Sequence, residues 1–159
     1  MKSKKSGGKP PQEEAEAIAL RLLARREHSR AELELKLRQR GLPGEVIAPV
    51  LDDYEARGWL SDERYAEMLV RQRLETGHGP LRVRADLQQK GIRETPAAFS
   101  EITEQQWCAS AVGARRKRFG LKNLRNDREA RARQGRFLAR RGFRQEQIEH
   151  ALAQTDEEG

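Results

Sequence analysis

Residues 58–92 read GWLSDERYAEMLVRQRLETGHGPLRVRADLQQKGI and set the pattern of the whole chain. The stretch opens with a Gly-aromatic turn and an acidic helix start at residues 61–63, where carboxylates favour the positive end of the helix dipole. A helix carrying arginines follows, and Gly79-Pro80 interrupts it, because proline suits the first turn of a new helix. The stretch therefore predicts two helices joined by a tight turn.

The end of this stretch recurs on both sides of it. Residues 37–42 (LRQRGL), 87–92 (LQQKGI) and 138–143 (LARRGF) share Leu, a base three positions on, Gly and an apolar residue. The glycines of these hexads are 50 and 51 residues apart. Regular spacing on this scale is typical of tandem repeats, and glycine is the usual left-handed residue that ends a helix. The sequence predicts three repeats of three helices.

Composition favours slender helices over one thick core. Of 159 residues, 36% are apolar, 5% aromatic and 36% charged, so each helix can bury only one stripe. Residues with high helix propensity dominate, and no alternating run of β-branched residues predicts a strand. We expect an all-α, elongated array with repeats at 13–60, 61–103 and 104–154. A disordered basic tail at 1–12 and an acidic tail at 155–159 would flank them.

Several local signals place the helices of the first and third repeats. A first helix is predicted over residues 14–27, and Ser29 is predicted to cap the second, with Glu32 completing a capping box. A third should start at residue 43 or 44, with Pro49 kinking it or delaying its start. Asp127 is the expected cap of the basic helix in the third repeat.

The net charge of +7 is concentrated in the last third of the chain. Residues 104–154 carry thirteen basic and five acidic residues, whereas residues 61–103 carry seven of each. Such an excess attracts phosphate backbones or an acidic protein surface. A solvated basic face is the alternative, and charge alone does not separate the two.

Basic side chains outside the apolar stripes are the candidate binding residues. Arginines flank the Gly-Pro turn of the second repeat, and a denser run crosses the third, where only Asp127 and Glu129 are acidic within residues 115–144. Such a run repels itself unless a polyanion or an acidic partner faces it. The predicted surface comprises Arg71, Arg73, Arg82, Arg84, Lys90, Arg115, Arg116, Lys117, Arg118, Lys122, Arg128, Arg131, Arg136 and Arg140.

Signals for catalysis, metals or cofactors are weak. His28, His78 and His150 lack ligand spacing with Cys108, so we expect surface histidines, a core cysteine, no metal and no cofactor. No phosphate-binding or nucleophile motif occurs. A single cysteine fits a reducing compartment, and no apolar run is long enough to cross a bilayer, so we expect a cytoplasmic protein and a monomer.

The aromatic residues are expected in the core and not as stacking platforms for bases. Six of them, Trp59, Tyr65, Trp107, Phe119, Phe137 and Phe143, fall mostly at helix ends or on apolar stripes. Basic helices without exposed aromatics indicate contact with a nucleic-acid backbone and not with bases.

The chain resembles the RecX family in residues 58–66 (GWLSDERYA) and 79–92 (GPLRVRADLQQKGI). The flanks agree at residues 28–33 and 140–143, so the resemblance covers roughly residues 15–153. It implies a curved array of three-helix units that acts without catalysis on the RecA recombinase. Family members bind the groove of the RecA–DNA filament, suppress its activities, and bind single- and double-stranded DNA weakly. Ser61 and the Arg-rich third repeat depart from the family pattern.

A direct DNA-binding protein of the helix-turn-helix type is the alternative. Short helices joined by glycine turns could place residues 127–141 in a major groove. That helix offers arginine almost uniformly and little Asn or Gln to discriminate bases, which disfavours this alternative.

Overall fold

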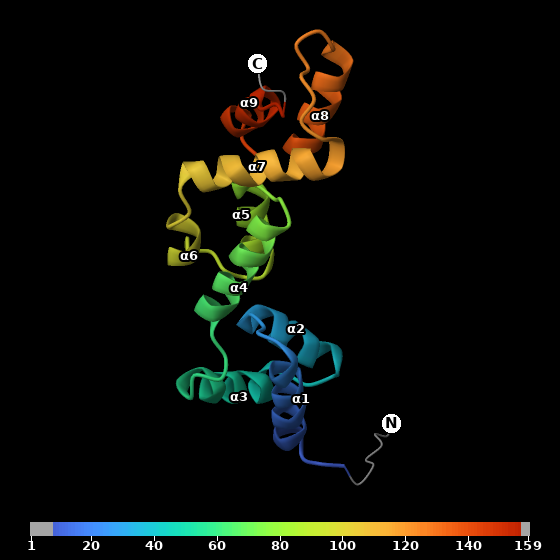
Figure 1. The fold of residues 1–159 in the computed structure, drawn as a ribbon. Coiled ribbons are helices and arrows are strands. Elements are labelled where there is room, and N and C mark those ends of the chain that lie inside the picture. Colours follow the sequence, from blue (N-terminus) through green and yellow to red (C-terminus); the bar gives the residue numbers. More distant parts are fainter. Residues whose placement is uncertain (1–7, 157–159) are drawn as a thin grey trace. The chain divides into compact units, whose positions relative to one another are not determined.

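The structure, a computed structural model, describes residues 8–156, and all regular structure within that range is helical (Figure 1). The first repeat holds three helices, α1 (Pro11–Arg25), α2 (Arg30–Gln39) and α3 (Gly44–Ala56). The second holds α4 (Asp62–Glu75), α5 (Pro80–Gln89) and the short α6 (Ala97–Ser100). The third holds α7 (Glu104–Phe119), α8 (Arg128–Arg140) and α9 (Gln145–Ala153). The all-α prediction with three tandem three-helix repeats is confirmed.

The predicted tails lie mostly outside the described part of the chain. Residues 1–7 and 157–159 are not described, so the disorder expected there stays a prediction. The boundary at residue 12 needs correction, because α1 already begins at Pro11. A proline costs nothing in the first turn of a helix, where its missing N–H would have no partner.

The repeated hexad is a helix-ending motif. In the first repeat, Gly41 has φ +86°, and its N–H donates to the carbonyl of Arg38 at 2.9 Å. The next N–H, of Leu42, donates to the carbonyl of Leu37 at 3.2 Å. This pair of bonds satisfies carbonyls at the helix end and brings the two leucine positions of the hexad together. Leu37 is fully buried and Leu42 nearly so.

The third repeat ends α8 with the same bonds. The N–H of Gly142, at φ +93°, donates to Ala139, and that of Phe143 donates to Leu138. Leu138 and Phe143 are both buried. Gly91 has φ +83° at the end of α5. The pattern found in the sequence is therefore a left-handed glycine followed by an apolar residue, which is buried in the first and third repeats and half-buried at Ile92.

By contacts the chain divides into two compact units. The first comprises residues up to Tyr65 together with 90–92, and the second comprises 66–89 and 93 onward. In the first unit, α1, α2 and α3 pack on one another around a core that includes Ile18, Leu33, Leu37 and Leu51. Helix α3 runs unbroken through Pro49, so the proline does not delay its start at Gly44.

The start of α2 differs from the prediction in two ways. The hydroxyl of Ser29 accepts from the N–H of Glu32 at 3.1 Å, as expected of a cap. The Glu32 carboxylate, however, binds Arg26. His28, expected on the surface, is only 1% exposed, and its Nδ1 lies 3.0 Å from the carbonyl of Arg26. Packing beside the N-cap of α2 buries the imidazole. The polar sequence around His28 does not indicate this burial.

In the second unit, α8 and α9 both pack on α7 and on each other (Figure 1). Their core contains Ala111, Leu138, Ile148 and Leu152. Asp127 caps α8 by accepting from the N–H of Ala130 at 3.0 Å, as predicted. Alanines on α7 leave room for the larger side chains of α9, and Phe143 completes this core.

The Gly-Pro turn joins the second and third repeats within this unit. The N–H groups of Gly79 and Leu81, at the start of α5, donate to the carbonyls of Arg141 and Gly142 at 2.8 and 2.9 Å. The first orphan donors of one helix thus satisfy the last carbonyls of another. A Cβ on Gly79 would lie 2.4 Å from the Gly142 oxygen, so only glycine allows this approach. The turn is a joint between helices, as the sequence favoured, and not a phosphate loop.

Candidate nucleic-acid and protein interface

Nine cations form one candidate surface in the third repeat. All are exposed, and they lie on the last turn of α7, the following loop and the outer sides of α8. We call this set the third-repeat basic surface: Arg116, Lys117, Arg118, Lys122, Arg125, Arg128, Arg133, Arg136 and Arg140. Within residues 8–156 none of the nine has a salt-bridge partner at 4.0 Å or less. Their charge is available to an anionic ligand.

Arg115 was predicted for this surface, and that prediction is wrong. The side chain is fully buried, and its Nε donates to the amide oxygen of Gln134 at 2.8 Å. Its two Nη atoms donate to three backbone carbonyls, those of Ala151, Gln154 and Lys122, at 2.6–2.9 Å. Burial lowers the pKa of the guanidinium, with only weak compensation from Asp156.

The role of Arg115 is therefore to position the surface and not to bind. One side chain ties α7 to α8, to the end of α9 and to the loop at Lys122. The carbonyls at the end of α9 carry the negative end of a helix dipole, which suits a cation. The sequence held a signal for this: Arg115 follows the buried Trp107 and Ala111 at four-residue intervals, so it continues their helix face.

Helix α8 has a buried face and an exposed face. Ala130, Gln134 and Leu138 are buried against α7 and α9. Arg136 and Arg140 are exposed, and so is Arg133, which the sequence argument left out. Gln134 is the only amide side chain on α8, and Arg115 holds it inside. The exposed part of α8 consequently offers cations but no amide that could read a base edge.

Arg131 stands apart from the nine because its charge is already matched. Its Nη2 donates to a carboxylate oxygen of Glu149 on α9, and the two side chains form an exposed ion pair. Arg141 and Arg144 were also absent from the predicted set. Arg141 donates to the carbonyl of Thr76 at 2.8 Å, so it supports the joint between repeats. Arg144 is exposed before α9.

Two of the predicted cations of the second repeat share one carboxylate. Asp86 on α5 accepts from the Nε of Arg73 at 2.7 Å and from the Nε of Arg82 at 3.2 Å. Arg84 lies with its guanidinium carbon 5.0 Å from the centre of the Phe99 ring. Arg71 is exposed on α4. One carboxylate thus pairs with two of the arginines that sequence reasoning assigned to the binding surface.

Lys90 is the remaining predicted residue, and it belongs to the first unit. Its Nζ lies 3.9 Å from Glu32, whose side chain is only 7% exposed. Arg26 and Lys36 bind the same carboxylate. Burial alone would raise the pKa of Glu32, but the hydrogen bond from Arg26 and the charges of Arg26 and Lys90 lower it to about 2. Lys90 therefore serves an internal ion cluster.

Aromatic and cysteine side chains offer no reactive or stacking site in the described residues. Tyr65, Trp107 and Phe143 are buried as expected, while Phe119 and Phe137 are half-buried and meet edge-to-face. Trp59 contradicts the prediction, because it is 43% exposed and rests on Tyr54 with Arg57 over its ring.

Cys108 is half-buried and not in the core, and burial raises the pKa of its thiol, which disfavours the nucleophilic thiolate. Residues 8–156 contain no cluster of three or more metal-binding side chains. Within the same range, no helix combines the length and apolar character needed to cross a bilayer.

Comparison with known proteins identifies all three repeats. Three family profiles match in order: the first three-helix domain of RecX at residues 15–53, the second at 61–97 and the third at 104–152. The regulatory protein RecX of Halorhodospira halophila is 42% identical over 143 residues, which cover 88% of this chain and 87% of that protein. That of Acidithiobacillus ferrooxidans is 47% identical over 136 residues, covering 86% and 87%.

A solved structure agrees in fold. The crystal structure of RecX from Lactobacillus salivarius superposes with a TM-score of 0.75 at 24% identity, covering 89% of this chain and 94% of that one. At that identity the similarity supports the fold alone, whereas the profiles and the curated relatives establish the family to which the chain belongs. The chain therefore belongs to the RecX family of regulatory proteins.

Proposed function

We propose that this protein is a non-enzymatic negative regulator of the bacterial RecA recombinase. It binds in the groove of the RecA–DNA filament, where it blocks extension or promotes disassembly. ATP hydrolysis, strand exchange and co-protease activity fall as a result. The protein acts in the cytoplasm as a monomer, and it touches single- and double-stranded DNA weakly, through the backbone.

The observation that carries this proposal is the third-repeat basic surface on a chain whose relatives are regulatory proteins. Nine exposed cations have no carboxylate within ion-pair distance in the described residues. A filament of recombinase on DNA presents phosphates and acidic side chains together, which is the environment that such a surface favours.

Contacts to phosphates are favoured over contacts to base edges. The exposed part of α8 carries arginines, and its one amide, Gln134, is held by Arg115. Backbone contacts position a protein on DNA without specifying sequence. This disfavours the alternative of a sequence-specific helix-turn-helix protein, for which a binding preference between random and selected duplexes would be required.

The test is the DNA-dependent ATPase of RecA on single-stranded DNA. We expect the protein to slow this ATPase and strand exchange at sub-stoichiometric amounts, because one bound molecule affects several filament subunits. Unchanged ATPase and strand exchange at saturating protein would refute the proposal.

Two charge-matched variants locate the surface responsible. The triple variant Arg128→Ala, Arg136→Ala, Arg140→Ala removes three cations from the third-repeat basic surface. The control, Arg21→Ala, Arg25→Ala, Arg40→Ala, removes three exposed cations of the first repeat. Inhibition should weaken about tenfold or more in the first variant and little in the second, since only cations that face the phosphates or carboxylates of the filament contribute to binding. Equal losses would mean that net charge, and not this surface, governs binding.

A further inference from the structure

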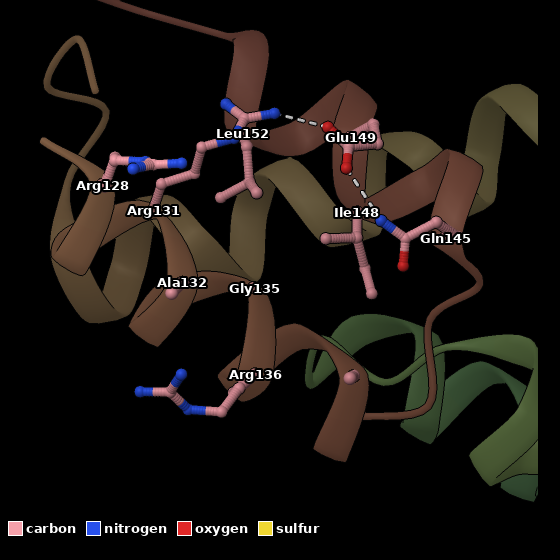
Figure 2. A pocket seen from close by; sticks show the side chains of 10 residues that line it. Arg128, Arg131, Ala132, Gly135, Arg136, Gln145, Ile148, Glu149 and Leu152 are labelled. Atoms are coloured by element: carbon pink, nitrogen blue, oxygen red, sulfur yellow. Dashed lines mark hydrogen bonds and ion pairs between the residues drawn. The ribbon is translucent and has the colours of Figure 1, made fainter. Parts of the chain in front are cut away.

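A groove of about 490 Å³ runs between α8 and α9 on the third repeat. Figure 2 shows its lining, with Ala132 and Gly135 on one side and Ile148 and Leu152 on the other. A Cβ on Gly135 would be in van der Waals contact with Leu152 and Ile148, at 3.7 and 3.8 Å, and both of these side chains are only 5% exposed. The base of the groove is therefore apolar.

The rim of the groove is cationic. Arg128 and Arg136 are exposed, and neither has a salt-bridge partner within the part of the chain that the structure describes. Arg131 reaches from α8 to Glu149 on α9, and Gln145 donates to the same carboxylate at 2.8 Å (Figure 2). Glu149 thus occupies one cation of the rim and leaves the other two available.

An apolar base inside a cationic rim fits a particular kind of ligand. A phosphate backbone gains no hydrogen-bond donor from the side chains of Ile148 and Leu152 or from Gly135, whereas apolar side chains of a protein can contact them. A protein segment with apolar side chains on one side and carboxylates on the other matches both features, as helices do when they bind in grooves.

We infer that the α8–α9 groove binds an acidic amphipathic segment of a partner protein. Apolar side chains of the segment contact Gly135, Ile148 and Leu152, while its carboxylates pair with Arg128 and Arg136. A carboxylate of the segment also competes with Glu149 for Arg131. The inference deepens the proposed function, on which it rests for the source of the segment. The groove takes the protein component of the target, and the remaining cations of the third-repeat basic surface take phosphates.

The experiment measures binding of three fluorescent probes to the full-length protein in the absence of recombinase. The first is a peptide of about sixteen residues with Glu and Leu at helical spacing, long enough to form about four turns. The second replaces every Leu with Ser and keeps the charge, and the third is single-stranded oligothymidine. Variants are Gly135→Met, which fills the groove without changing charge, Gly135→Ala as its control, and Glu149→Gln, which releases Arg131.

We expect the Glu/Leu peptide to bind and the Glu/Ser peptide to bind at least about tenfold more weakly, since apolar anchors dominate affinity in such grooves. Gly135→Met should weaken the Glu/Leu peptide by about the same factor and leave oligothymidine unchanged. Glu149→Gln should strengthen the peptide several-fold. Gly135→Ala should keep the fold, with melting no lower than wild type, because alanine is the better helix former.

Three results would overturn the inference. The first is equal binding of the two peptides, and the second is peptide binding that Gly135→Met does not change. In the third, Gly135→Met weakens oligothymidine as much as the peptide, which would make the groove a nucleic-acid contact. Failure of the proposed function looks different: peptide binding would follow the expected pattern while the ATPase of RecA stayed unaffected.

Discussion

The first and third repeats share one helix-ending motif and use their charges in opposite ways. In the first repeat, Arg26, Arg30, Lys36, Arg38 and Arg57 all pair with carboxylates. In the third, Arg131 alone pairs within the described residues, and the nine cations of the third-repeat basic surface and Arg144 remain exposed and unpaired. The common motif, a left-handed glycine before a buried anchor, fixes the fold in both. The difference teaches that fold and binding potential are encoded separately, by the apolar residues and by the placement of acids.

Cations of the third repeat are also divided between inside and outside. Arg115 is buried in α7, while Arg116 beside it is exposed. In the first repeat the buried ionic group is instead an acid, Glu32, surrounded by three bases. Each repeat thus stabilises itself around one buried charge, and the sign of that charge differs.

Replacing Arg115 is expected to have the largest effect on stability. Arg115→Ala removes the donors for Gln134 and for three carbonyls, and it leaves a cavity at the centre of the third repeat. Buried acceptors without partners cost about 1–3 kcal/mol each, so we expect the second unit to lose about 3 kcal/mol or more. Chemical denaturation followed by Trp107 fluorescence measures the loss. The neighbour Arg116→Ala is the control and should change stability by less than about 0.5 kcal/mol.

If Arg115 were an exposed binding residue, the two variants would behave alike. If Arg115→Ala and Arg116→Ala both left stability unchanged but weakened DNA binding equally, the division of the two residues would be wrong. The loss should also appear in Trp107 and not in Trp59, since each unit contains one of the two tryptophans of the chain.

The hexad glycines come next in expected effect. Gly41 and Gly142 both have positive φ, so alanine is strained at either, by about 1–2 kcal/mol. A Cβ at Gly142 would also lie 2.4 Å from the Cβ of Arg82, whereas nothing lies within 4 Å of one at Gly41. Gly142→Ala should therefore lower the stability of its unit by at least about 1 kcal/mol more than Gly41→Ala lowers that of the first. Equal losses would mean that backbone strain alone decides the glycine requirement.

How much the sequence could predict follows from these same residues. The fold was predictable, because each hexad marks the end of a helix by its glycine and contains leucine or another apolar residue that packs in the core. The Gly79–Gly142 contact was not, since nothing local indicates that the start of one helix approaches the end of another sixty residues away. Pro80 was nevertheless placed correctly at the first helical position.

The candidate surface was predictable only in part. Counting charges located the excess in the third repeat, but it could not separate Arg115 from Arg116 or find the carboxylate of Asp86 between Arg73 and Arg82. Helix periodicity would have placed Arg115 inside, on the face of Trp107 and Ala111. The pairing of Arg73 and Arg82 needs the geometry of two helices, which periodicity within one helix does not provide. His28 failed for a related reason, since its burial depends on the cap of the next helix.

Acid should weaken both units below about pH 6.5, and the first unit further below pH 4.5. Burial lowers the pKa of His28 in the first unit and of His78 in the second below 6.5, so the unfolded chain binds protons that the folded one resists, and the stability of both units falls as pH drops below about 6.5. Glu32, with a pKa of about 2 against 4.5 when unpaired, adds stability above pH 4.5 that is lost as pH falls towards 2. Thermal melting at pH 7, 5 and 3 should lower both transitions between pH 7 and 5, and should lower the Trp59 transition more than that of Trp107 between pH 5 and 3.

A matched variant tests the cause of this shift. His28→Gln removes the titrating ring from the same site, so the loss between about pH 7 and 5 should shrink, while the later loss from Glu32 remains. If the Trp59 transition of this variant kept its full dependence above pH 5, another group would be responsible and the contrast between the repeats would weaken.

The smallest expected effect comes from releasing paired cations in the first repeat. Glu34→Gln with Asp53→Asn breaks two exposed pairs, those with Arg38 and Arg57, and raises the net charge by two. Such pairs contribute about 0.3–0.5 kcal/mol each, so melting should hardly change. If placement of charge governs binding, affinity for an oligonucleotide should rise by no more than about twofold, because the released arginines lie outside the third-repeat basic surface.

A control with the same net charge is Asp127→Asn with Glu129→Gln, which removes two negative charges beside that surface. Affinity should rise more in this control, and α8 should lose a little stability because Asp127 caps it. If both variants instead raise affinity equally at low salt, with equal salt slopes, net charge alone governs phosphate binding. The difference between the two repeats would then concern stability only.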